Sequence, residues 1–151
     1  MKYNEVLKEL RISKQLTQEE LANILNINRV QYNQYENDYN TIPIKHLINL
    51  SNYFQVPIDY IFNLTPKAKD IYSKTEITPV IAGIRLKEFR KDQGITQQRL
   101  AQILNTNQSV IANYERGRTF IATSFLYTIC KKYNVSADYL LGKTDEPKYL
   151  N

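Results

Sequence analysis

The segment from Thr96 to Arg118 reads TQQRLAQILNTNQSVIANYERGR and decides how the rest of the chain is interpreted. A run of apolar residues at helical spacing ends in the polar stretch Asn105 to Asn107, and a second short amphipathic segment follows. Thr96 and Asn107 stand where the two helices would begin, and each offers a side-chain oxygen to unpaired backbone N–H groups. The segment therefore predicts two short helices joined by a tight turn.

The second predicted helix would present polar side chains to solvent. Ile111 and Tyr114 fall on its inward side, which leaves Gln108, Ser109 and Asn113 pointing outward. The major groove of DNA admits a helix, and Gln and Asn make bidentate pairs with adenine there. A small, amide-rich, uncharged helix start is typical of the recognition helix of a helix-turn-helix.

Two motifs here resemble those of a known family. The pattern T-Q-x-x-L-A at Thr96 to Ala101, followed by Y-E-x-G-R at Tyr114 to Arg118, is similar to the lambda-repressor-like Xre (Cro and cI type) regulators of bacteria and phages. In that family the first motif opens the helix-turn-helix and the second closes the recognition helix. The resemblance implies a non-enzymatic, sequence-specific regulator that binds double-stranded DNA.

The chain repeats itself at an offset of 79 residues, without a gap. The matched positions include Leu7 with Leu86, Arg11 with Arg90, Thr17 and Gln18 with Thr96 and Gln97, and Tyr35 and Glu36 with Tyr114 and Glu115. The repeat predicts an all-α fold of two tandem five-helix lambda-repressor-like domains, at residues 1–64 and 79–143. Residues 65–78 would be a short linker, either plain or with one short helix through Ile71 and Tyr72. The tail 144–151 is expected to fray.

The resemblance also assigns contacts in the second domain. Gln97 would lie with its backbone N–H and side chain near a phosphate, at the positive end of a helix. The base-reading residues would be Gln108, Ser109 and Asn113, and the other phosphate contacts would be Asn107, Arg116 and Arg118. Solvated polar positions on a helix surface are the alternative from composition alone, and the surrounding motif favours DNA contact.

The first domain departs from this pattern. Asn37 and Tyr39 stand where the second domain has Arg116 and Arg118, so two phosphate contacts are missing. Arg29 could still read guanine, Gln34 could read adenine and Gln18 would approach a phosphate. Tyr32 replaces the inward Ile111, and its hydroxyl would need water or a partner group. The sequence leaves open whether this domain contacts DNA specifically or binds a protein partner.

Other conspicuous residues are expected to be structural. In the family, the positions of Arg11 with Glu36 and of Arg90 with Glu115 form internal salt bridges that tie the first helix to the end of the third. His46 is the only histidine, so a histidine triad or a multi-histidine metal site has no basis, and we expect it on the exposed side of its helix. The only cysteine, Cys130, excludes intrachain disulfides and is expected in the core.

The composition agrees with a folded DNA-binding protein. The 151 residues carry a formal charge of +5 with a pI of about 9.2, and most of the positive excess lies in residues 83–151, which have eleven Lys and Arg against six Asp and Glu. No apolar run is long enough for a membrane span, so a cytoplasmic location is expected. No cofactor is expected. A repressor is the favoured function. An antitoxin-like or adaptor protein whose first domain binds a protein is the alternative, and the sequence leaves a homodimer open.

Overall fold

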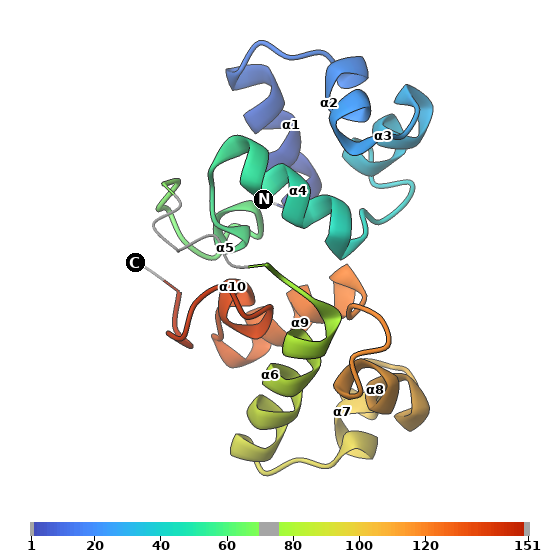
Figure 1. The fold of residues 1–151 in the computed structure, drawn as a ribbon, viewed down its shortest axis with the longest axis vertical. Coiled ribbons are helices and arrows are strands. Elements are labelled where there is room, and N and C mark those ends of the chain that lie inside the picture. The colour runs from blue at the N-terminus through green and yellow to red at the C-terminus, as the bar shows by residue number, and fades with distance from the viewer. Residues whose placement is uncertain (1, 70–75, 150–151) are drawn as a thin grey trace. The chain divides into compact units, whose positions relative to one another are not determined.

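The computed structural model describes residues 2–69 and 76–149, and over these residues the chain forms helices and no strands (Figure 1). The chain divides into two compact units, with residues 2–69 in the first and residues 76–149 in the second. The predicted all-α fold with two tandem domains is therefore confirmed. None of the described helices combines the length and apolar character that crossing a membrane requires.

Each unit contains five helices in the same order. In the first unit they are α1 (Tyr3–Ser13), α2 (Gln18–Leu25), α3 (Arg29–Glu36), α4 (Ile44–Phe54) and α5 (Ile58–Ile61). In the second they are α6 (Pro79–Asp92), α7 (Gln97–Ile103), α8 (Gln108–Glu115), α9 (Thr123–Tyr133) and α10 (Ala137–Leu140). The helix-turn-helix pairs are α2 with α3 and α7 with α8, and the members of each pair pack against one another.

Side-chain caps fix where the paired helices begin. Thr17 accepts a hydrogen bond from the backbone N–H of Glu20, and the Glu20 side chain accepts from the backbone N–H of Thr17, which together form a capping box. Thr96 caps α7 by accepting from the backbone N–H of Arg99. Asn28 and Asn107 cap the two recognition helices. The starts of α7 and α8 are thus set by the residues that the sequence indicated, and the equivalent residues 79 positions earlier set those of α2 and α3.

The backbone turns repeat as faithfully as the helices. Each described residue with a left-handed φ in one unit has a left-handed counterpart 79 residues away in the other; the pairs are Gln15 and Gly94, Asn26 and Asn105, Asp38 and Gly117, Gln55 and Asn134, and Asn63 and Gly142. Three of the second unit's positions are glycine, whereas the first unit holds all five with side-chain-bearing residues, which this conformation disfavours.

Each unit has its own apolar core, built from the inward stripes of its helices. Leu7, Leu21, Tyr32, Leu47 and Leu50 are fully buried in the first unit. Leu100, Ile111, Ile129, Cys130 and Leu141 are fully buried in the second. Cys130 is therefore a core residue, as expected.

Two expectations about individual segments are wrong. His46 is buried rather than exposed, because its ring packs 6.2 Å from that of Tyr35 on α3. Residues 144–149 do not fray: Arg85 donates to the Thr144 carbonyl at 3.0 Å, and the backbone N–H of Ser136 donates to the Pro147 carbonyl at 2.8 Å. Residues 65–69 and 76–78 contain no helix, and the suggested helix through Ile71 and Tyr72 lies outside the described residues.

Candidate nucleic-acid interface

The second recognition helix, α8, is held against α6 by an unusually close backbone approach. Gly83 of α6 is buried, and a Cβ atom at this position would lie 2.4 Å from the Tyr114 carbonyl oxygen, so any larger residue would push the helices apart. The first unit has Asn4 at the equivalent position, and its side-chain amide donates to the Glu36 carbonyl at 3.0 Å. A direct contact in one unit is thus replaced by a hydrogen bond in the other.

A buried ion pair ties the end of each recognition helix to the first helix of its unit. Arg90 Nε lies 2.7 Å from Glu115 Oε2, and Arg90 also donates to Glu115 Oε1 and to the Ile95 carbonyl, each at 3.0 Å. Arg11 and Glu36 repeat the pair, with Nε 2.8 Å from Oε2. The hydrogen bond to the glutamate raises the pKa of each arginine, so both remain charged. Both ion pairs that the family resemblance implies are present.

In the second unit a series of side-chain hydrogen bonds connects this ion pair to the exposed start of α8. Gln97 donates through Nε2 to Glu115 Oε1 at 3.0 Å, and its Oε1 accepts from Gln108 Nε2 at 3.4 Å. These two hydrogen bonds fix the amide of Gln97 and orient that of Gln108. Because the Gln97 side chain is occupied internally, the group it offers outward is its backbone N–H at the start of α7.

The first unit has an equivalent series of hydrogen bonds, but it ends at a different residue. Gln18 donates to Glu36 Oε1 at 3.3 Å, but its own oxygen accepts from Asn33 rather than from the residue that begins the helix. Arg29, which begins α3, is exposed and has no hydrogen bond or ion pair to any described residue. The guanidinium of Arg29 is therefore free to contact a ligand.

The other predicted contact residues of the second unit gather around α8. Ser109 is exposed and donates to Asn107 Oδ1, the oxygen that also caps the helix through the backbone N–H of Val110. Asn113 is half-buried one turn further along. Arg116 and Arg118 are exposed in the closing turn, and neither guanidinium has a hydrogen bond or ion pair within the described part of the chain.

The equivalent face of the first unit has a different character. Gln34 is half-buried, and its side-chain oxygen accepts from Asn40 Nδ2 at 2.6 Å, a bond that would have to open before this amide could pair with a base. Val30 is 59% exposed and Tyr39 is 78% exposed. Tyr32 is fully buried, and its hydroxyl has no hydrogen-bond partner among the described residues. Burial, together with the Glu36 carboxylate, raises the pKa of Tyr32, so it stays neutral.

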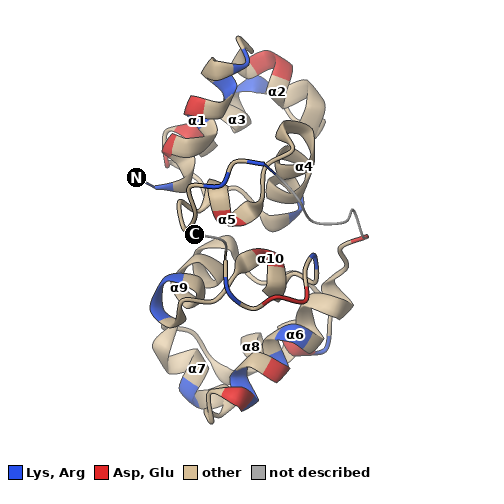
Figure 2. Ribbon diagram, turned by 90° about the vertical axis from the view of Figure 1, so that its left-hand side faces the viewer, with Lys and Arg blue, Asp and Glu red and all other residues tan. Residues whose placement is uncertain are grey.

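Charge distinguishes the starts of α2 and α7. Figure 2 shows red acidic residues at α2, which are Glu19 and Glu20, and a blue basic residue at α7, which is Arg99. The Glu20 carboxylate turns back to Thr17 and does not project from the helix. Arg99 is an exposed cation beside the α7 N-terminus that sequence reasoning missed, although aligning it with Glu20 would have revealed the difference.

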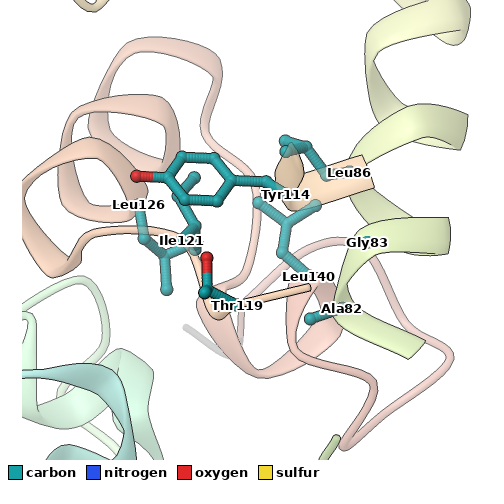
Figure 3. Close-up of a pocket in the computed structure, with 8 residues that line it drawn as sticks. All are labelled: Ala82, Gly83, Leu86, Tyr114, Thr119, Ile121, Leu126 and Leu140. Carbon is teal, nitrogen blue, oxygen red and sulfur yellow. The ribbon is translucent and has the colours of Figure 1, made fainter. Parts of the chain in front are cut away.

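A small apolar cavity lies behind α8 and offers no room for an effector. It is lined by Ala82, Gly83 and Leu86 of α6 and by the Tyr114 ring, with Ile121, Leu126, Leu140 and Thr119 around them (Figure 3). Its volume is about 10 Å³, which is the space of a single water molecule. The Tyr114 hydroxyl accepts from the backbone N–H of Ala122 at 3.3 Å, which holds the ring in place.

The capped helix pairs, each closed by a tight turn and locked by an arginine–glutamate pair, define both units as helix-turn-helix domains. Residues 7–61 match the model of a helix-turn-helix family, and residues 83–146 match that of a second helix-turn-helix domain. Together these matches span well over half the sequence. The chain belongs to the lambda-repressor-like, Xre-type helix-turn-helix family and contains two of its domains in tandem.

Several proteins are similar to part of the chain. The HTH-type transcriptional regulator ImmR of Bacillus subtilis is 44% identical over 44% of this chain and 52% of its own length. Antitoxin PezA of Streptococcus pneumoniae is 33% identical over 46% of this chain and 42% of its own. The crystal structure of the hypothetical transcription factor NHTF from Neisseria is 22% identical, with a TM-score of 0.40, and covers 48% of this chain and 88% of that one. The chain spans about half the length of the curated relatives it matches.

Proposed function

We propose that the chain is a sequence-specific transcriptional regulator that binds double-stranded DNA and acts by occupying its site, most simply as a repressor. The observation that supports this is the pair of recognition helices, α3 and α8. Each is anchored at its end by a buried arginine–glutamate pair, and each presents exposed polar side chains at its start. A helix of this kind suits the DNA major groove.

In the second domain, base edges and phosphates would be contacted by different groups. Gln108 is oriented by Gln97 and reads a base, assisted by Ser109 and Asn113. The Gln97 backbone N–H, Asn107, Arg116 and Arg118 contact phosphates and set the register of the helix in the groove, and we add Arg99 to this group.

In the first domain, Arg29 reads guanine and Gln34 reads adenine once its bond to Asn40 opens, while Gln18 lies at a phosphate. Two domains in one chain raise each other's effective concentration on DNA, so a monomer would read an asymmetric site and a homodimer a longer one. The protein would do this in the cytoplasm, without catalysis and without a cofactor.

The test is selection of bound sequences from random duplex DNA by the intact chain, followed by affinity measurements with variants. Gln108→Ala should lose about 1 to 3 kcal/mol on the selected site and little on unrelated DNA, because it removes a base contact. Ser124→Ala, an exposed polar change on α9, serves as the control. Failure to enrich any sequence, or equal loss from both variants, contradicts the proposal.

A second candidate is an antitoxin-like or adaptor protein whose first domain binds a protein partner while the second binds DNA. The absence of Arg116 and Arg118 equivalents at Asn37 and Tyr39 favours it, and a relative named as an antitoxin is consistent with it. If Arg29→Ala leaves DNA affinity and its salt dependence unchanged while Gln108→Ala does not, the result favours a first domain that binds a protein partner. Comparable losses from both substitutions rule it out.

A further inference from the structure

The first recognition helix exposes a large apolar side chain that the contacts proposed above do not use. Val30 is 59% exposed on α3, and it is the only exposed large apolar side chain among the residues of this helix, all of which are described. The equivalent residue of the second domain is Ser109, which is polar. The two recognition helices therefore offer different chemistry at the same position.

The residues on either side of Val30 in α3 are polar. Arg29 precedes it, with a guanidinium that is bonded to none of the described residues, and Gln34 follows it by one turn of the same helix. Gln34 contacts the closing turn, since its backbone carbonyl accepts from the Tyr39 N–H at 2.9 Å. A protein-docking surface needs a contiguous apolar patch, whereas one branched side chain between two hydrogen-bonding groups matches a surface that carries a single methyl group.

The DNA major groove offers such a group. The 5-methyl of thymine projects into this groove and is recognised by apolar contact, while guanine presents two acceptors that suit an arginine. We propose that Val30 packs against a thymine methyl next to the guanine read by Arg29, so that the first domain selects a thymine-containing half-site. This inference rests on the proposed function, because it requires the first domain to enter the groove.

The experiment removes the methyl group without disturbing base pairing. Each thymine of the duplex selected by the intact chain is replaced in turn by uracil, and affinity is measured for the unchanged protein and for Val30→Thr and Val30→Ser. Ile12→Ser, which alters a similarly exposed apolar residue on α1, is the control for a change in surface hydrophobicity. Helical content measured by circular dichroism establishes that each variant is folded.

We expect uracil at one thymine of the first half-site to weaken binding by the unchanged protein about fourfold, the factor for removing one methyl from a buried contact. Val30→Ser should bind the thymine and uracil duplexes equally, Val30→Thr should keep part of the difference, and Ile12→Ser should keep all of it. Uracil in the second half-site should affect every variant alike.

Two failures are distinguishable. If a sequence is selected but no uracil substitution separates Val30→Ser from the unchanged protein, the thymine contact is overturned, the proposed function stands, and the exposed valine is left for a protein partner. If the intact chain selects no sequence at all, the proposed function and this inference both fall.

Discussion

His46 is the single histidine of the chain, and its surroundings should make the first domain sensitive to acid. The residue is 8% exposed, and Nδ1 has no hydrogen-bond partner in the part of the chain that the structure describes. Burial, with a smaller effect from Lys45, lowers the pKa of His46 below its ordinary value of 6.5. The unfolded chain keeps the ordinary pKa, so it binds the proton more readily than the folded domain does.

The free energy of unfolding of the first domain should therefore decrease as the pH falls through 6.5 and below. Denaturant unfolding of the intact chain across this range measures the change, and the imidazole NMR signal gives the pKa directly, because there is only one histidine. His46→Phe, which introduces the residue found at the equivalent Phe125, should lose this part of the pH dependence. An NMR midpoint at or above the ordinary value would refute the interpretation.

The sequence predicted the helix caps correctly and the exposure of His46 wrongly, because the caps depend on local contacts and the burial of His46 does not. Capping by Thr96 and Asn107 depends on a residue and the backbone two or three positions away, so a local pattern carries all the information. The position of His46 depends on Tyr35, which belongs to a different helix. The polarity of the imidazole predicted an exposed position. In the structure it is buried, because it packs against an aromatic ring on α3.

The turn that follows the recognition helix α8 packs against the start of α6. Gly117 has a φ of +76°, and a Cβ atom there would lie 2.7 Å from the Val80 Cα. A side chain at this position would suffer both backbone strain and a collision with a helix. The turn also carries Arg116 and Arg118, so its position controls where these two cations lie.

Gly117→Ala should destabilise the second domain by clearly more than Gly94→Ala. Gly94 also has a positive φ, +69°, but a Cβ atom there would meet no described atom within 4 Å, so its replacement costs only the conformational term of about 1 kcal/mol. The difference between the two variants isolates the collision with Val80, and denaturant unfolding measures it. Equal destabilisation would mean that α6 moves aside without cost.

The tail, residues 144–149, is held by a contact that sequence patterns do not reveal. Pro147 and the small number of core residues in the tail suggested a frayed end. Arg85 of α6 nevertheless holds the tail through the Thr144 carbonyl and Asp145 Oδ1, and lies 4.4 Å from the centre of the Tyr139 ring. The equivalent of Arg85 in the first domain is Val6, so the repeat gave no indication of this contact. A single long side chain reaching across some 60 residues of sequence leaves no periodic signal.

For the whole molecule, the two domains share a fold but differ in charge. Residues 1–66 carry six Lys and Arg against seven Asp and Glu, whereas residues 83–151 carry eleven against six. The closing turns show the same contrast, with Arg116 and Arg118 in one domain and Asn37 and Tyr39 in the other. If both domains bind DNA, the second should supply most of the electrostatic affinity, while the first depends on uncharged contacts and on Arg29.

The salt dependence of binding tests this division. In the intact chain bound to its selected duplex, Arg116→Ala with Arg118→Ala should reduce the slope of log affinity against log salt by about two, since each phosphate contact releases about 0.9 of a counterion. The matched pair Asn37→Ala with Tyr39→Ala changes the same positions of the first domain and should leave the slope unaltered, because neutral side chains release no counterions. Fluorescence anisotropy titrations over a series of salt concentrations measure both slopes. A loss of slope from the Asn37 and Tyr39 pair, or none from the arginine pair, would show that affinity is not divided between the domains according to their charge.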